Sequence, residues 1–221
     1  SPAVRAHQEN DTVSQTTPVP LLDVTRNSDE YHRELIATCE RVLSSGRFIL
    51  GDEVTEFEDE IAAEIGVKHA IGVSSGTDAL LLALMALGVG EGDEVICPTF
   101  TFFATAGSIW RVGAKPVFVD CGPDSFNLDV EAIQEAITPQ TKAIMPVHLT
   151  GRPAEMTEII SISTDHGIPI IEDAAQAISA TYRGQHVGTF GAIGCFSLHP
   201  LKTLNACGDG GVLVTDDDTI L

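Results

Sequence analysis

The chain is poor in basic residues. Its 221 residues contain 12 Lys and Arg against 32 Asp and Glu, which gives a formal net charge of -20 at pH 7. Because such a surface repels nucleic-acid phosphates and anionic lipid headgroups, neither is expected as a partner. Lysine is especially scarce and occurs only as Lys68, Lys115, Lys142 and Lys202.

Long apolar runs and paired cysteines are also missing. No stretch approaches the ~20 apolar residues that a membrane-spanning helix needs, and residues 1–18 are polar, unlike the apolar core of a secretory signal. The five cysteines are odd in number and form no CxxC pair, so neither a disulfide framework nor a cysteine zinc site is expected. This pattern predicts reduced thiols in a cytoplasmic protein, with no bound metal.

The periodicity divides the chain into a short arm and one large domain. Residues 1–18 are polar and aperiodic, which predicts a disordered arm. Residues 19–221 predict the domain, which opens with helices at 29–44 and 53–65. Strands are then expected at 69–73, 94–97, 115–119, 143–147, 168–171, 193–196 and 212–215, with helices at 77–87, 104–112, 130–137 and 155–166.

The alternation of these elements predicts an α/β fold. Strands that are apolar throughout and separated by helices are typical of a parallel sheet covered on both faces. The last two strands have no helix between them, so one of the two is expected to run antiparallel. We therefore predict a three-layer domain with a mostly parallel seven-stranded sheet.

Chemically active residues follow several of these strands, at the edge of the sheet where such folds bind ligands. Residues 74–77 (Ser-Ser-Gly-Thr) open a helix, whose free N–H groups and positive dipole end suit a phosphate. A plain N-cap is the alternative. Residues 100–103 (Phe-Thr-Phe-Phe) hold three aromatics in a chain that is only 5% aromatic. They suit stacking on a planar ring, although each alone is more typical of a core.

Two later strand ends carry an acid and a lysine. Asp173 ends the fifth strand and is suited to pair with a protonated ring nitrogen, although it could also cap the following turn. The small Ala175 leaves room for a flat ring, and Gln176 can donate to a phenolate oxygen. Lys202 follows a strand that ends in Ser197 and precedes a glycine-rich segment. Such a lysine suits a Schiff-base role, although a loop lysine is more often simply solvent-facing.

Together these segments resemble the large domain of the DegT/DnrJ/EryC1/StrS family of sugar aminotransferases, which are fold-type I enzymes that depend on pyridoxal phosphate (PLP). The resemblance extends from about Pro20 to the end of the chain. Its motifs are Phe-Ile-Leu-Gly (48–51), Ser-Ser-Gly-Thr-Asp-Ala-Leu (74–80), Pro-Thr-Phe-Thr-Phe-Phe-Ala-Thr (98–105), Pro-Val-His-Leu-Thr-Gly-Arg-Pro-Ala-Glu-Met (146–156), Glu-Asp-Ala-Ala-Gln-Ala (172–177), Phe-Ser-Leu-His-Pro-Leu-Lys (196–202) and Gly-Asp-Gly-Gly (208–211).

The resemblance implies a role for each candidate residue. Lys202 is expected to hold PLP as a Schiff base and to move the proton, and Asp173 to keep the pyridine nitrogen charged. The remaining cofactor contacts that it implies are Gln176 at the ring hydroxyl, Phe102 and Ala175 at the two ring faces, and Gly76, Thr77 and Ser197 at the phosphate. The substrates implied are an amino donor, which is typically glutamate in this family, and a keto-sugar on a nucleotide carrier. A homodimer with the site at its interface is implied as well.

Three features depart from the family pattern. The chain stops at Leu221, where relatives continue into a smaller C-terminal domain, so we expect either a fragment of a longer enzyme or a stand-alone cofactor-binding domain. Asp209 stands where many relatives have glutamate, and Thr150 where an aromatic is common. Two alternatives to the aminotransferase therefore stay open: a non-catalytic or regulatory PLP-binding module, and a doubly wound protein for another phosphate ligand.

Overall fold

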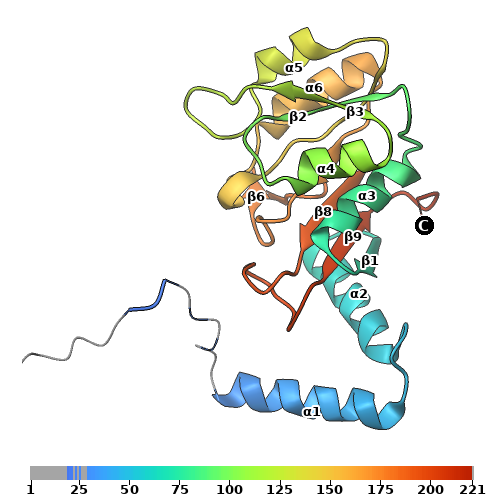
Figure 1. Cartoon of the computed structure of the whole chain (residues 1–221), viewed down its shortest axis with the longest axis vertical. Coiled ribbons are helices and arrows are strands. Elements are labelled where there is room, and N and C mark those ends of the chain that lie inside the picture. Colours follow the sequence, from blue (N-terminus) through green and yellow to red (C-terminus); the bar gives the residue numbers. More distant parts are fainter. Residues whose placement is uncertain (1–18, 22, 24, 26–28, 221) are drawn as a thin grey trace, which may run out of the picture.

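The structure is a computed structural model that describes residues 19–21, 23, 25 and 29–220. The arm predicted at residues 1–18 lies outside this range. In chain order the elements are α1 (Asp29–Ser45), α2 (Asp52–Ile65), β1 (His69–Val73), α3 (Gly76–Ala86), β2 (Glu94–Pro98), α4 (Ala104–Arg111), β3 (Lys115–Val119), α5 (Val130–Ala136), β4 (Thr141–Ile144), the 3-10 turn η1 (Leu149–Gly151), α6 (Met156–His166), β5 (Ile171–Asp173), β6 (Thr181–Tyr182), β7 (Gln185–His186), β8 (Ile193–Ser197) and β9 (Gly211–Thr215), as Figure 1 shows.

The strands form a four-stranded sheet in the order β1-β9-β8-β5 and a three-stranded sheet in the order β3-β2-β4. The β2–β3, β2–β4 and β5–β8 pairs are parallel. Strand β9 is antiparallel to both β1 and β8, so the expectation of one antiparallel strand among the last two is confirmed. A short hairpin, β6–β7, was not predicted.

The single seven-stranded sheet predicted from the sequence is not confirmed, because the strands divide into two sheets. Only isolated parallel bridges, Ile144 to Ile170 and Val147 to Asp173, connect them. Pro146 and Pro169 lie at this junction, and proline has no N–H to donate to a strand ladder. Their carbonyls still accept, from Asp173 N–H at 2.9 Å and Ile144 N–H at 3.0 Å. The prolines thus shorten both strands without separating them.

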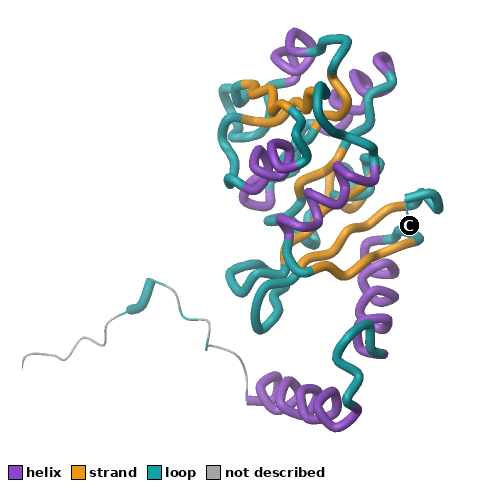
Figure 2. The backbone as a smooth tube through the Cα atoms, turned by 45° about the vertical axis from the view of Figure 1, so that its right-hand side comes forward, coloured by secondary structure: helices purple, strands orange, loops and turns teal. Residues whose placement is uncertain are grey.

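Helices cover both faces of the sheets, as the backbone trace in Figure 2 shows. Along β2 the buried side chains alternate: Val95 and Cys97 belong to one core cluster, and Ile96 to another. The first cluster includes Leu80 of α3 and the second includes Ile159 of α6. A third cluster packs α2 against β8 and β9. The three-layer arrangement follows from this alternation, and it leaves the carboxyl ends of the parallel strands open at one edge.

Helix α1 differs from the others, because none of its residues is buried. It extends from the lower end of the molecule, beyond α2 (Figure 1). The loop after it exposes Phe48, Ile49 and Leu50 by 66%, 87% and 77%. Among the described residues, no helix has both the length and the apolar character needed to cross a bilayer.

Candidate functional site

A cavity of about 320 Å³ opens at the carboxyl ends of the parallel strands. All eight residues selected from the sequence line it, although they come from four separate segments of the chain. They are Gly76, Thr77, Phe102, Asp173, Ala175, Gln176, Ser197 and Lys202. The fold therefore brings together every predicted site residue at one place.

One end of the cavity is built by the start of α3. Ser75 caps this helix, and its Oγ accepts the Asp78 N–H at 3.0 Å. The N-cap alternative is thus realised, and it leaves the N–H groups of Gly76 and Thr77 ahead of the first intrahelical bond, where an anion can accept them. A Cβ placed on Gly76 would lie 2.6 Å from the Ser197 Cβ. Only glycine allows the helix start to approach the end of β8 this closely.

We expect Gly76→Ala to destabilise the chain by about 1–3 kcal/mol, because the added methyl overpacks this contact. It should also weaken phosphate binding, since the helix start must move away from Ser197. Urea unfolding of the free chain and titration with inorganic phosphate measure the two effects.

Gly208→Ala is the matched control, because a Cβ at Gly208 meets nothing within 4 Å. Its unfolding free energy should stay within about 0.5 kcal/mol of the unsubstituted chain. Equal destabilisation by both variants would contradict the close-approach explanation.

The base of the cavity holds Asp173, which is only 4% exposed. Its Oδ2 accepts the Thr105 hydroxyl at 2.7 Å, and its Oδ1 accepts the Ala175 N–H at 3.2 Å. Burial raises the pKa of Asp173, and the two hydrogen bonds, together with the nearby His148 and Lys202, act in the opposite direction. The turn-capping alternative is realised through Ala175, while the carboxylate still faces the cavity.

Gln176 is oriented by the turn that follows β4. Its Oε1 accepts the Thr150 N–H at 2.8 Å, so Nε2 is the side of the amide that can donate to a ligand. Thr150 has a positive φ of 54°, which turns its N–H toward Gln176. The sequence identified both residues but gave no sign of this contact.

The three phenylalanines do not act as one cluster. Phe102 lines the cavity and is 70% exposed. Phe100 packs on Phe126, with ring centroids 5.1 Å apart, and Phe103 lies over Gly107. Stacking on a ligand thus falls to Phe102 alone.

Lys202 lies in the loop after β8 and lines the cavity. Its N–H donates to the His199 carbonyl at 2.8 Å, which closes a tight turn. Sequence reasoning did not select several other residues of the cavity wall, among them Thr101, His199, Leu201 and Gly210, and it named Asp209 only as a departure from the family pattern. It also missed Thr105, whose spacing of four from Thr101, across the start of α4, brings the two hydroxyls within 2.8 Å of each other.

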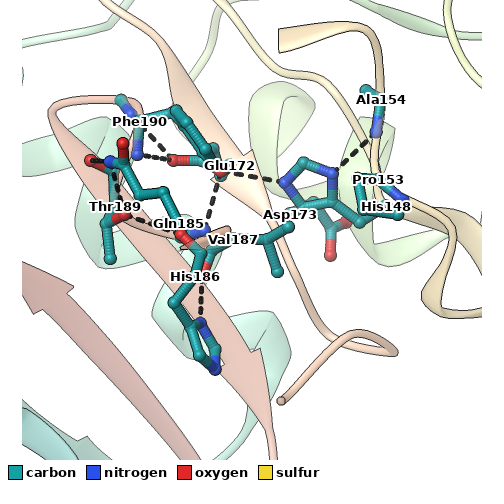
Figure 3. A network of polar contacts seen from close by, with 12 residues as sticks. His148, Pro153, Ala154, Glu172, Asp173, Gln185, His186, Val187, Thr189 and Phe190 are labelled. Atoms are coloured by element: carbon teal, nitrogen blue, oxygen red, sulfur yellow. Dashed lines mark hydrogen bonds and ion pairs between the residues drawn. The ribbon is translucent and has the colours of Figure 1, made fainter. Parts of the chain in front are cut away.

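Behind the cavity lies a buried polar network, shown in Figure 3. Glu172 is fully buried and accepts the N–H groups of Gly188, Phe190 and Gly191, each at 2.7 Å. His148 is also fully buried and lies 2.9 Å from Glu172. Its Nδ1 accepts the Ala154 N–H, so Nε2 carries the proton that is donated to Glu172. His148 therefore has a structural role and does not line the cavity.

These residues fit PLP in three respects. Gly76 has no side chain, so the start of α3 lies close to Ser197 and a phosphate can reach the N–H groups of the helix start. A buried carboxylate lies at the base, and an amine, Lys202, is near enough to affect its charge. The orientation of Gln176 directs a donor toward the ligand. Cysteine, histidine and acidic side chains of the described residues form no group of three suited to a metal.

Comparison with known proteins gives a consistent result. The model of the DegT/DnrJ/EryC1/StrS aminotransferase family matches residues 29–221. A pleiotropic regulatory protein from Geobacillus stearothermophilus is 50% identical, over 91% of this chain and 54% of its own length. The UDP-N-acetyl-3-dehydro-alpha-D-glucosamine 3-aminotransferase of Acidithiobacillus ferrooxidans is 49% identical, over 93% and 56%.

A solved structure is similar as well. NtdA from Bacillus subtilis, with its bound cofactor PMP, superposes with a TM-score of 0.87 at 36% identity, over 97% of this chain and 48% of the NtdA chain. The chain therefore spans about half the length of the proteins that it matches.

Proposed function

The chain belongs to the DegT/DnrJ/EryC1/StrS aminotransferase family, and from this premise we propose that it is the PLP-binding large domain, residues 19–221, of a sugar aminotransferase. Its reaction moves an amino group from an amino acid, with glutamate as the expected donor, to a keto-sugar carried on a nucleotide. The observation that carries the proposal is the convergence of Asp173, Lys202 and the open start of α3 on one cavity.

Each residue has a task in this reaction. PLP, when bound, supplies an aldehyde for amines and a ring that draws electrons from the substrate carbon. The N–H groups of Gly76 and Thr77, with the Ser197 hydroxyl, would hold its phosphate. Asp173 would stabilise a proton on the ring nitrogen, and Gln176 Nε2 would donate to the ring hydroxyl. Phe102 and Ala175 would confine the ring from its two faces.

Lys202 has two tasks. Its Nζ would hold PLP covalently as a Schiff base. As a free amine, the same group would act as the acid and base that carries a proton at the substrate carbon. It can serve both steps because the turn closed by His199 keeps the lysine at the cavity wall.

A homodimer is part of the proposal. Exposed large apolar side chains occur around the cavity mouth and in the loop after α1. They include Phe48, Ile49, Leu50, Phe102, Phe103 and Leu201, each at least 58% exposed. Apolar surface of this kind marks an interaction site, and a second copy of the chain is the occupant that the family resemblance implies.

A cytoplasmic location is also proposed, on the evidence of the cysteines. All five are free thiols, and burial raises the pKa of Cys97 to about 12. A buried thiol of this kind stays protonated and unreactive, as suits a structural residue in a reducing compartment.

The absorbance spectrum tests the function and its alternative together. We expect the chain to turn yellow with PLP, and the colour to become fixed on borohydride reduction. Glutamate should then bleach the band as the amino group passes to the cofactor. A stable colour that glutamate leaves unchanged would support a non-catalytic regulatory module, which the name of the Geobacillus relative favours. A chain that stays colourless with PLP would contradict both the aminotransferase and the PLP-binding module. The remaining hypothesis would be a protein that binds another phosphate ligand.

A further inference from the structure

Two threonine hydroxyls connect the cavity wall with the buried Asp173. Thr101 lines the cavity, and its Oγ1 lies 2.8 Å from the Oγ1 of Thr105. Thr105 is fully buried, and its hydroxyl donates to Asp173 Oδ2 at 2.7 Å. Thr101 precedes α4 and Thr105 lies in its first turn, so the helix start holds both groups.

From this geometry we infer that Thr105 is a positioning residue of the cofactor site, which acts through Asp173 as the middle member of a directional hydrogen-bond chain. The inference deepens the proposed function and rests on it. Thr105 fixes Oδ2, while the Ala175 N–H fixes Oδ1. The carboxylate is thereby held in one plane, and each oxygen keeps a further lone pair for a ring N–H.

The donor and acceptor in each hydrogen bond from Thr101 through Thr105 to Asp173 follow from counting protons. When Asp173 is ionised, as a partner of a ring cation must be, its carboxylate only accepts hydrogen bonds, so Thr105 donates its single hydroxyl proton to Asp173. Thr105 can then only accept from Thr101, which must donate in turn. Thr101 therefore presents lone pairs to the cavity and no proton. The wall at Thr101 suits a ligand group that donates, such as an ammonium or a hydroxyl, and disfavours a phosphate or a carboxylate.

These hydrogen bonds also affect the charge state of Asp173. Burial favours the neutral acid, and among the opposing influences the Thr105 hydrogen bond is the largest. His148 and Lys202 act in the same direction as Thr105. Burial raises the pKa of the neighbouring Cys195 thiol, and the charges of Asp173 and Glu172 add to that rise. Removing the Thr105 hydroxyl should therefore leave Asp173 as a weaker partner for a ring cation.

The decisive variants are Thr105→Val, which replaces the hydroxyl by a methyl group in a side chain of nearly the same shape, and Thr105→Ser, which keeps a hydroxyl. Thr101→Val removes the hydrogen bond from Thr101 to Thr105 instead. Thr215→Val is the matched control, because Thr215 is a buried threonine on β9 whose hydroxyl bonds the Ala192 carbonyl at 2.8 Å, away from the cavity.

The first readout uses the chain without cofactor. In carboxyl 13C NMR, with Asp173→Asn to assign the signal, Thr105→Val should raise the proton affinity of Asp173 about tenfold or more, since hydrogen bonds to charged groups are among the stronger ones. Thr101→Val should have a smaller effect, and Thr105→Ser and Thr215→Val almost none. Equal titration of Asp173 in Thr105→Val and the unsubstituted chain would overturn the inference, and so would equal shifts in Thr105→Val and Thr105→Ser.

The second readout uses 15N-labelled PLP. In Thr105→Val the pyridine-nitrogen signal should move toward that of the unprotonated ring, and serine should restore it. An unchanged ring signal would also overturn the inference. Failure of the unsubstituted chain to bind PLP would instead refute the proposed function, and the titration without cofactor would still decide whether Thr105 acts on Asp173.

Discussion

Lys202→Ala is expected to abolish the yellow band that the chain forms with PLP and to slow amino transfer by about 10³-fold or more. Two losses combine, because the same amine binds the cofactor covalently and moves the proton, and proton transfer by one positioned side chain alone contributes about 10²–10⁴-fold. The band is measured by absorbance, and the rate as single-turnover bleaching by glutamate.

The scarcity of lysine gives this experiment a simple control. Lys142 is an exposed lysine on β4, outside the cavity lining. Lys142→Ala should keep both the band and its reduction by borohydride. If Lys202→Ala stayed yellow and reducible, another amine would hold the cofactor, and the assignment of Lys202 would be wrong.

Asp173→Asn is expected to slow amino transfer by about 10²–10³-fold, the size of effect seen when one preorganised electrostatic contact is removed. A neutral amide cannot stabilise the charged ring nitrogen, so the ring draws electrons less strongly. The fold should survive, because the amide oxygen can accept from Ala175 N–H and the amide nitrogen can donate to Thr105, which then donates to Thr101. The measurement is the rate of bleaching, with cofactor affinity determined separately.

The same variant should change how stability depends on pH. Because burial raises the pKa of Asp173 in the folded chain, its contribution to stability is fully present below the ordinary aspartate pKa of about 4 and is lost as the pH rises through the raised value. Asparagine does not titrate. In urea unfolding without cofactor, Asp173→Asn should therefore gain stability relative to the unsubstituted chain between pH 4 and pH 7. A difference that stays constant over this range would contradict the raised pKa.

The lining of the cavity was largely predictable from the sequence because its parts are local. A strand end followed by Ser-Ser-Gly-Thr, or by Asp-Ala-Ala-Gln, carries its chemistry within a few residues, and the parallel sheet then brings the strand ends together. The contact between Thr105 and Asp173 spans 68 residues, so no local pattern reveals it. The orientation of Gln176 depends likewise on the positive φ of Thr150. A threonine in the sequence does not predict a positive φ.

The errors in the fold have equally specific causes. The apolar runs around residues 143–147 and 168–171 predicted two full strands, but Pro146 and Pro169 interrupt the ladder between them. The β6–β7 hairpin has strands of only two residues each, which is too short for an alternating pattern to appear. The structure places its turn at Arg183 and Gly184, both with positive φ. The glycine was a sequence signal for this turn.

The contacts of Glu172 have a consequence for the time scale of motion. Its carboxylate accepts three N–H groups from the loop between β7 and β8. We therefore expect these amides to exchange with solvent only when their hydrogen bonds to the carboxylate break. Glu172 is fully buried on β5, which pairs with β8, so release of its side chain requires the surrounding core to loosen. We therefore expect this buried to half-buried loop to exchange as slowly as the strands β5 and β8, although secondary structure alone would place it among the fast-exchanging parts of the chain.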